Sequence, residues 1–272
     1  MKKFNKLFKN KKPVIGMIHV EALPGTPNYK GNVKRIISKA LEEAEIYSNS
    51  GIDSIAIENM HDVPYMKNSV GPEITSLMTI IAYEIKNKFK LPVGIQILAG
   101  ANKEAIAAAH ASGIDFIRAE GFVFAHVADE GIIESNAGEI LRYRKMIGAE
   151  NILVFTDIKK KHSSHSITSD VTIEETAHAA EFFLSNGLIV TGVATGKEVE
   201  PSDLLSVKKS SKLPVIIGSG ITIENVEKYF PLCDAMIIGS YFKKKGDWKN
   251  SVDSNRVKLF MKKINLLRKR KS

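Results

Sequence analysis

The chain repeats one pattern eight times: a short apolar stretch that ends at polar or small residues, then a loop, then a segment suited to a helix. Buried parallel strands have this composition, and helical crossovers join them. Eight such units favour a closed (β/α)8 barrel, the TIM-barrel class, over an open doubly wound sheet, which usually has fewer strands. The predicted strands are residues 14–19, 52–58, 92–98, 116–120, 152–157, 188–190, 215–217 and 235–238.

The length of 272 residues fits one barrel-sized domain. We predict a barrel domain at residues 13–267, a flexible basic N-terminal extension at residues 1–12 and a basic C-terminal tail at residues 268–272. Neither the G-x-G-x-x-G motif of dinucleotide-binding folds nor a Walker A motif occurs in the sequence. The sequence therefore predicts no redox cofactor.

The formal net charge of +9 is located at the two ends of the chain. Residues 1–12 contain six lysines and no acidic residue, and residues 262–271 contain six basic residues and no acidic one. Because such tails are usually solvated, we expect no sequence-specific nucleic-acid binding. No apolar run is long enough for a membrane span and no secretory signal is evident, so we expect a cytoplasmic protein. Cys233 is the only cysteine, which excludes an intrachain disulfide and a Cys-rich metal site.

Two glycine-containing turns follow the last two predicted strands. Gly218, Ser219 and Gly220 follow the seventh strand, and Gly239 and Ser240 follow the eighth. Glycines let backbone N–H groups approach an anion closely, with help from the positive end of a following helix. In TIM barrels a phosphate commonly binds after these two strands. The turns therefore predict a phosphate site, and two ordinary turns are the alternative.

Ionisable and polar residues follow the other strands. Acid–base catalysis uses such groups when their pKa values differ, and we assign this role to Glu58 and Asp157, with His19 and Arg118 orienting the reacting oxygen. The alternative is that Arg118 and Glu120 only neutralise each other. The candidate catalytic residues are Glu58, Asp157, His19, Arg118, Glu120 and His162; the candidate substrate-binding residues are Asn59, Gln96, Lys161, Thr191 and Gly192.

The loop after the fifth strand, residues 158–170, is long, polar and rich in lysine and histidine. We interpret it as a cationic lid in which Lys161 and His162 close over an anionic substrate. A metal site is the alternative, because Asp157, His162 and His165 could join His19 as oxygen and nitrogen ligands of a divalent metal. No other cofactor is predicted.

Several long motifs occur in the order found in one known family. The chain resembles the BtpA/SgcQ family at residues 14–27 (VIGMIHVEALPGTP), 57–64 (IENMHDVP), 116–131 (FIRAEGFVFAHVADEG), 141–144 (LRYR), 160–168 (KKHSSHSIT), 190–196 (VTGVATG) and 217–225 (IGSGITIEN). The resemblance implies a ribulose-phosphate-binding type of barrel. The family is named for a role in photosystem I biogenesis in cyanobacteria, and residues 116–131 depart from the typical cyanobacterial form.

Three functions are consistent with the sequence. The first is an enzyme that isomerises, cleaves or hydrolyses a phosphorylated small molecule, either a sugar phosphate or a nucleotide-derived phosphate. The second is a non-catalytic assembly or regulatory factor, and the third is a metal-dependent hydrolase centred on His19, Asp157 and His162. The sequence leaves a homo-oligomer open.

Overall fold

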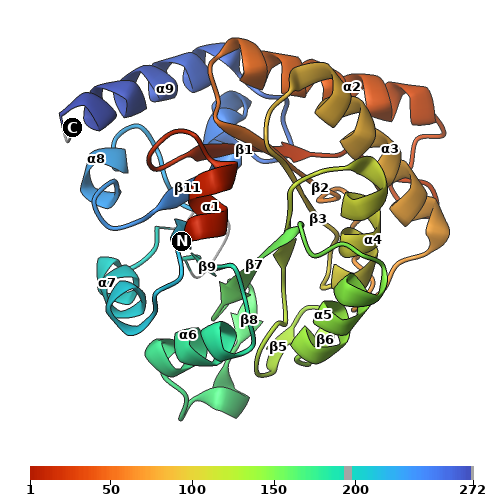
Figure 1. The fold of residues 1–272 in the computed structure, drawn as a ribbon. Coiled ribbons are helices and arrows are strands. Elements are labelled where there is room, and N and C mark those ends of the chain that lie inside the picture. Colours follow the sequence, from red (N-terminus) through yellow and green to blue (C-terminus); the bar gives the residue numbers. More distant parts are fainter. Residues whose placement is uncertain (193–197, 271–272) are drawn as a thin grey trace.

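The computed structural model describes residues 1–192 and 198–270. Eight parallel strands form a closed barrel in the order β1-β11-β10-β9-β7-β4-β3-β2, and helices surround it (Figure 1). The predicted TIM barrel is confirmed. Its strands are β1 (Val14–His19), β2 (Ser54–Glu58), β3 (Val93–Gln96), β4 (Phe116–Ala119), β7 (Leu153–Ile158), β9 (Gly187–Val190), β10 (Val215–Ile217) and β11 (Ala235–Ile238).

The helices between the strands begin and end at residues suited to those positions. The side chain of Asn32 accepts a hydrogen bond from the Arg35 N–H at the start of α2, and Gly113 ends α4 in the left-handed conformation. The helices are α2 (Val33–Asn49), α3 (Pro72–Phe89), α4 (Asn102–Ser112), α5 (Ala137–Met146), α6 (Ile173–Phe182), α7 (Pro201–Ser210), α8 (Val226–Tyr229) and α9 (Ser254–Lys269).

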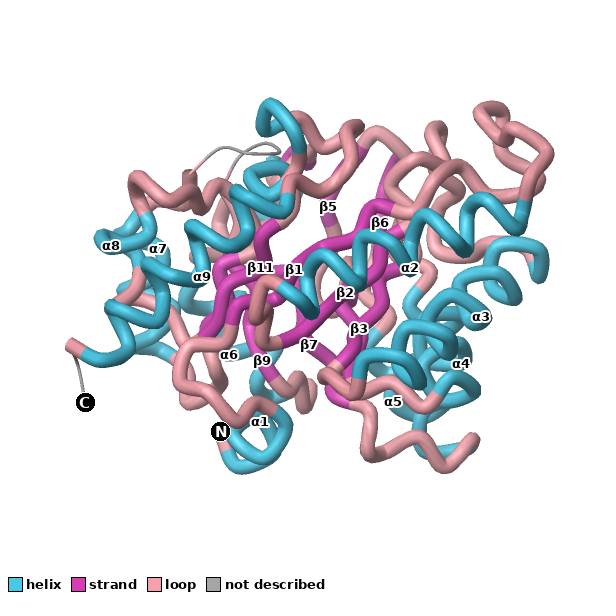
Figure 2. Tube along the Cα trace, turned by 90° about the horizontal axis from the view of Figure 1, so that it is seen from above, coloured by secondary structure: helices cyan, strands magenta, loops and turns pink. Residues whose placement is uncertain are grey.

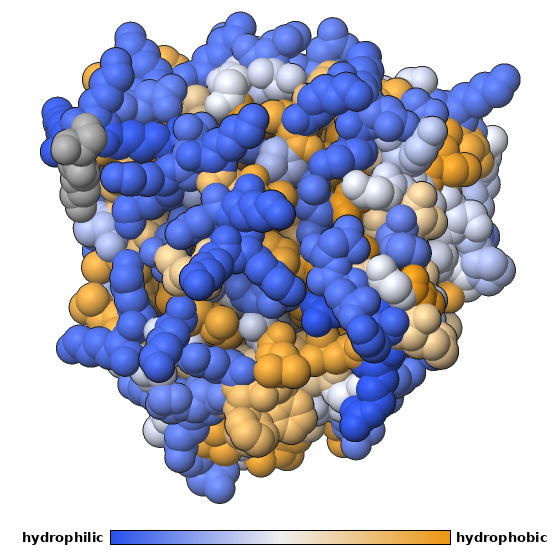
Figure 3. Space-filling view, viewed as in Figure 1, coloured by the Kyte–Doolittle hydropathy of each residue, from blue (hydrophilic) through white to orange (hydrophobic). Residues whose placement is uncertain are grey.

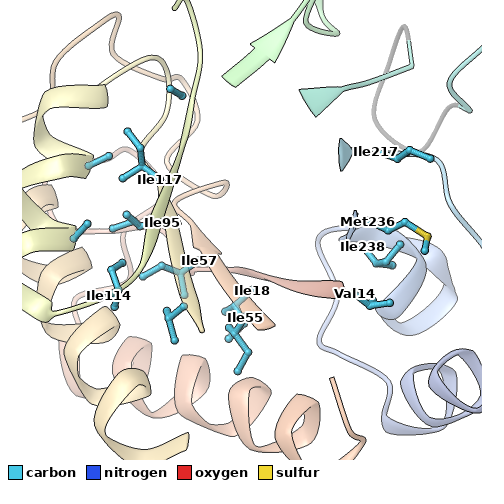
Figure 4. Packing of buried hydrophobic residues seen from close by; sticks show 14 of the residues in the cluster. Val14, Ile18, Ile55, Ile57, Ile95, Ile114, Ile117, Ile217, Met236 and Ile238 are labelled. Carbon is cyan, nitrogen blue, oxygen red and sulfur yellow. The ribbon is translucent and has the colours of Figure 1, made fainter. Parts of the chain in front are cut away.

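Side chains of most barrel strands alternate between two hydrophobic clusters. Outward-facing residues such as Ile18, Ile57 and Ile117 pack against the helices (Figure 4). Inward-facing residues of the same strands, among them Met17 and Phe116, fill the N-terminal end of the barrel. This period of two predicts which residues at the other end face the barrel axis.

The N-terminal segment differs from the flexible extension that we expected at residues 1–12. Lys2–Leu7 forms α1, and Phe4 and Phe8 are each only 5% exposed. Their rings contact aromatic residues inside the barrel, with centroid distances of 6.0 Å from Phe4 to Phe155 and 6.1 Å from Phe8 to Phe116. The apolar area that these rings bury favours the ordered position. Five lysines of the same segment remain exposed, namely Lys2, Lys3, Lys6, Lys9 and Lys11, whereas Lys12 is half-buried.

Helix α1 therefore closes the N-terminal end of the barrel, opposite β5 (His126–Ala128) and β6 (Gly131–Ile133) at the other end (Figure 2). Hydrophilic side chains gather over α1 on the surface of this face (Figure 3).

The predicted C-terminal tail also differs, because α9 extends through Lys269. Arg268 donates hydrogen bonds to the carbonyl oxygens of Lys11 and Lys12 and to a carboxylate oxygen of Asp53. This residue therefore joins the last helix to the segment that precedes β1. Residues 271–272 of the predicted tail lie outside the described residues.

The segment between β4 and α5 and the predicted loop at residues 158–170 together contain a small sheet. Strands β5 and β6 form a hairpin, and β8 (Ser163–Ser164) pairs with β5 in the order β6-β5-β8. The sheet lies at the end of the barrel where the strands terminate, which we call the mouth. Within the part of the chain that the structure describes, no helix combines the length and hydrophobicity needed to cross a bilayer.

Candidate active site

The alternation of the strands brings polar side chains to the inner side of the mouth. Two residues beyond inward-facing Met17 lies His19, and two beyond Ala56 lies Glu58. Strands β4 and β7 place Arg118 and Asp157 in the same way. The backbone geometry of eight strands thus gathers residues that are far apart in the sequence.

A cavity of ≈ 180 Å³ lies at the mouth, and both glycine turns border it. The candidate residues that line it are His19, Glu58, Arg118, Lys161, Gly218, Ser219, Gly220, Gly239 and Ser240. The ionisable side chains and the glycine turns therefore share one cavity.

The two turns need glycine for different reasons. A Cβ on Gly218 would lie 2.6 Å from Ile189 Cγ2, and Gly220 has a φ of +76°. A Cβ on Gly239 would lie 3.2 Å from His19 Nε2, so this position keeps the backbone close to that ring. These conformations and contacts suit a backbone that must approach a ligand.

No α-helix of the described residues begins directly after either turn, although we expected the positive end of a following helix there. The α-helix that follows Gly220 is α8, which has four residues and begins only at Val226. A 3₁₀ turn, Ser240–Phe242, follows Gly239. Positive charge at the cavity therefore comes from side chains, namely Lys161, Arg118 and Arg256, rather than from a long helix.

The imidazole of His19 is held in one tautomer. Its Nδ1 lies 2.9 Å from the carbonyl oxygen of Trp248. Because a carbonyl oxygen only accepts hydrogen bonds, Nδ1 carries the proton and Nε2 of the neutral ring is an acceptor. Burial, reinforced by the positive charge of Lys243, holds the pKa of His19 well below its usual value. His19 therefore presents a neutral ring to the cavity.

Glu58 lies beside this acceptor, with 4.0 Å between Glu58 Oε2 and His19 Nε2. Burial raises the pKa of Glu58, although the nearby charges of Arg118 and Lys161 oppose this effect. A carboxyl group with a raised pKa beside a neutral histidine can exchange protons with a bound molecule near neutral pH.

Arg118 and Asp157 form a buried bidentate ion pair. Arg118 Nε lies 2.8 Å from Asp157 Oδ2, and Arg118 Nη2 lies 2.9 Å from Oδ1. Burial lowers the pKa of Arg118, but the charge of Asp157 outweighs this and the net effect is a rise. Both carboxylate oxygens of Asp157 are engaged, so Asp157 is placed to orient Arg118 and not to act as a base.

This pairing differs from the alternative in which Arg118 and Glu120 neutralise each other. Glu120 instead accepts hydrogen bonds from Lys160 and from the Gln96 side-chain amide, each at 3.0 Å. Burial of Lys160 is outweighed by the charge of Glu120, so the pKa of Lys160 is raised. Gln96 and Glu120 therefore belong to a buried network beside the cavity.

The other predicted substrate-binding residues hold loops together. Asn59 accepts a hydrogen bond from the Leu98 N–H and donates one to Asp62. Thr191 Oγ1 accepts from the Lys161 N–H, and the Gly192 N–H donates to Ser219 Oγ. These bonds connect the lid segment and the first glycine turn to β9. Of the motif at residues 190–196, residues 193–196 lie outside the described residues.

The metal ligands considered in the sequence do not come together. His162 is exposed, whereas both oxygens of Asp157 bind Arg118. His165 Nε2 lies 3.0 Å from the carbonyl oxygen of Lys160. Among residues 1–192 and 198–270, no group of three or more His, Cys, Asp or Glu residues could hold a metal ion.

Four residues at the cavity or behind it were not predicted. Arg256, from the first turn of α9, lines the cavity, and Trp248 fixes the tautomer of His19. Lys243 is fully buried and donates to Glu43 Oε2 at 2.7 Å, while Glu43 Oε1 accepts from the Val252 N–H. Nothing in the spacing of these residues in the sequence indicates that they meet, because Glu43 and Lys243 are 200 positions apart.

The sequence has similar relatives over almost its full length. A protein of Caenorhabditis elegans described as "uncharacterized protein F13E9.13, mitochondrial" is 48% identical over 97% of this chain and 98% of its own. The photosystem I biogenesis protein BtpA of Synechocystis is 33% identical over 93% of this chain and 88% of its own.

The fold also has relatives among solved structures. Orotidine 5′-monophosphate decarboxylase from Methanocaldococcus jannaschii, in complex with the inhibitor BMP, aligns with 93% of this chain and 98% of its own, with a TM-score of 0.60 and 15% identity. This likeness shows the barrel fold alone. The sequence model of the BtpA family matches residues 10–266, so the chain is a member of the BtpA family.

Proposed function

We propose that this protein is an enzyme that uses acid–base chemistry on a phosphorylated small molecule, a sugar phosphate or a nucleotide-derived phosphate. One observation carries the proposal: both glycine turns border the same cavity as Glu58, His19 and Arg118. A phosphate held at one side of this cavity would place the rest of the molecule within reach of the ionisable side chains.

The roles follow from the contacts. The turns at Gly218 to Gly220 and at Gly239 and Ser240 hold the phosphate, and Lys161 and Arg256 supply positive charge. Glu58 transfers a proton to or from the substrate. The neutral His19 ring accepts a proton or a hydrogen bond at Nε2, and Arg118, oriented by Asp157, stabilises a developing negative charge on oxygen.

The solved structures of similar fold support a phosphorylated ligand by analogy. Orotidine 5′-monophosphate decarboxylase, by its name, acts on a phosphorylated molecule, and so does the phosphoribosyl anthranilate isomerase of Pyrococcus furiosus. Because one fold supports many reactions, this analogy extends to the phosphate and not to the chemistry. Isomerisation, carbon–carbon cleavage and hydrolysis all agree with the residues present.

A non-catalytic role in assembly is the second candidate, since the Synechocystis relative is named as a biogenesis protein. A scaffold has no need for a buried carboxyl with a raised pKa beside a neutral histidine. We therefore favour the enzyme. A cytoplasmic location remains part of the proposal, and the name of the nematode relative makes the mitochondrion the alternative for a fractionation experiment.

The proposal is tested by a thermal-shift screen of phosphorylated metabolites, followed by turnover assays with each compound that stabilises the protein. The Glu58→Gln variant should bind such a compound but lose turnover by about 100-fold or more, the usual contribution of a general acid or base. Glu84→Gln, on the exposed face of α3, is the matched control and should retain full activity. Stabilisation by no phosphorylated compound, or full turnover in Glu58→Gln, contradicts the proposal.

A further inference from the structure

A second and larger cavity, ≈ 680 Å³, lies beside the one that contains the glycine turns. His19 lines both cavities. Two loops also contribute to both: Met60 lines the first cavity and His61 the second, and Gly246 lines the first and Trp248 the second. The two cavities are therefore adjacent along three separate segments of the chain.

The rings of Trp248, His61 and His19 lie close together between the two cavities. The Trp248 ring is half-buried, with its centroid 5.0 Å from that of His61 and 6.2 Å from that of His19. The backbone of Trp248 is fixed as well, because its carbonyl oxygen binds His19 Nδ1. A partly exposed indole with an anchored backbone, at the edge of a polar site, is suited to stacking against a planar ring.

The two ends of the loop that contains Trp248 are held together. Lys243 and Val252 form an isolated antiparallel bridge, and Glu43 binds the side chain of Lys243 and the N–H of Val252. A preorganised aromatic surface binds a ring at a lower cost in conformational entropy than a mobile one.

The charges around the second cavity favour a neutral or anionic group. Its two carboxylates are already paired, Glu21 with Arg35 at 3.1 Å and Glu43 with Lys243 at 2.7 Å. Lys249 is exposed, and its Nζ lies 5.6 Å from the centroid of the Trp248 ring. A long lysine side chain can move to meet carbonyl or carboxylate oxygens on a stacked ring.

Resting on the phosphate site proposed above, we propose that the substrate is a phosphate ester with a planar ring, of the nucleoside monophosphate class. The phosphate lies at the glycine turns of the first cavity. The ring extends past His19 into the second cavity and stacks on Trp248, where Lys249 contacts its polar substituents. Glu58 and His19 then face the part of the molecule that joins phosphate and ring.

Trp248 is the only tryptophan in the chain, so its fluorescence reports directly on the second cavity. Three probes separate the parts of the site: inorganic phosphate, ribose 5-phosphate, and the nucleotides adenosine and uridine 5′-monophosphate. We expect at least one nucleotide to quench the fluorescence and to bind at least tenfold tighter than ribose 5-phosphate by calorimetry. Ribose 5-phosphate should bind with little quenching.

Two variants of Trp248 locate the ring. Trp248→Leu should reduce nucleotide affinity about tenfold and leave ribose 5-phosphate affinity unchanged, whereas Trp248→Phe, which keeps an aromatic face, should retain most of the nucleotide affinity. The unchanged ribose 5-phosphate affinity serves as the control for folding.

The outcomes distinguish the two proposals. If ribose 5-phosphate binds and neither nucleotide binds tighter, or if Trp248→Leu binds nucleotides as tightly as the wild type, the ring site is overturned and the phosphate site stands. If none of the phosphorylated probes binds, both the phosphate site and the ring site are overturned.

Discussion

The two ends of the barrel interior are built from successive inward-facing residues of the same strands, but these residues are apolar at the N-terminal end and charged at the mouth. On β4, Phe116 faces the N-terminal end and Arg118 the mouth; on β7, Phe155 and Asp157 do the same. The N-terminal end is stabilised by apolar area, to which Phe4 of α1 and Phe8, directly after this helix, contribute. The mouth buries charges, and these are stable only as pairs.

This difference shows how one barrel separates stability from chemistry. Removal of apolar area at the N-terminal end costs free energy in proportion to what is removed and leaves the mouth intact. Removal of one charge at the mouth leaves its partner buried without compensation. The two ends should therefore respond to substitution in different ways.

The largest effect is expected for Arg118→Met. The Asp157 carboxylate, 1% exposed, would then be buried without its partner, and the free energy of unfolding should fall by about 3–5 kcal/mol. Urea unfolding monitored by circular dichroism measures this loss. The double variant Arg118→Met/Asp157→Leu should recover most of the stability, and a double variant no more stable than the single one would show that the charges do not act as a pair.

At the N-terminal end, Phe8→Ala should lower the free energy of unfolding by about 3 kcal/mol, because it removes a buried aromatic ring that packs against the inside of the barrel. Binding of phosphorylated ligands at the mouth should not change. Lys6→Ala, on the exposed side of α1, is the control and should stay within about 0.5 kcal/mol of the wild type. A destabilised Phe8→Ala protein with weakened ligand binding would show that the two ends are coupled.

A smaller effect is expected from pH at Glu58. Burial raises the pKa of Glu58 in the folded protein, so the folded state holds this proton more tightly than the unfolded state. The contribution of Glu58 to stability is then complete at low pH and is lost as the pH rises from about 4 through the folded pKa. Glu58→Gln should thus gain stability relative to the wild type over this range, by about 1.4 kcal/mol for each pKa unit.

Thermal unfolding of both proteins between pH 4 and pH 8 measures this difference. If the stability of Glu58→Gln instead falls relative to that of the wild type as the pH rises, the charges of Arg118 and Lys161 outweigh burial and the pKa of Glu58 is lowered.

The smallest substitutions add one methyl group at each end of the barrel, at Gly239 in the mouth and at Gly94 near the N-terminal end. Gly239→Ala places a Cβ 3.2 Å from His19 Nε2 and should weaken phosphate binding about tenfold with little loss of stability. Gly94→Ala places a Cβ 2.1 Å from the Phe116 ring and should cost about 1–3 kcal/mol of stability, with phosphate binding retained in the folded fraction. Calorimetric titration with ribose 5-phosphate separates the two results.

The barrel could be predicted from sequence because its period-two strands and its glycine or capped helix ends are local signals. The same alternation predicts that His19 and Glu58 face one mouth, and the structure brings them to one cavity with both glycine turns. Local signals do not determine which charged side chains form ion pairs, however. Arg118 binds Asp157 rather than Glu120 because β4 lies next to β7, where Arg118 is in register with Phe155.

Contacts between distant segments account for the rest of what the sequence could not predict. The buried pair of Lys243 and Glu43 forms only when the segment after β11 packs on α2. In residues 1–12 the lysines outnumber the two phenylalanines, and charge alone predicts a solvated segment. Burial of Phe4 and Phe8 depends on an apolar opening that exists only in the closed barrel.

The pairing of β1 with β11 has a consequence for the order in which the protein is made. Val14 leaves the ribosome early, but its partner Met236 is made close to the end of synthesis. Until then β1 and β10 each keep an unpaired edge, and the cluster beneath them lacks Ala235 and Ile237. Nascent chains that end before β11 should therefore aggregate or bind chaperones, whereas release of the complete chain should end that dependence.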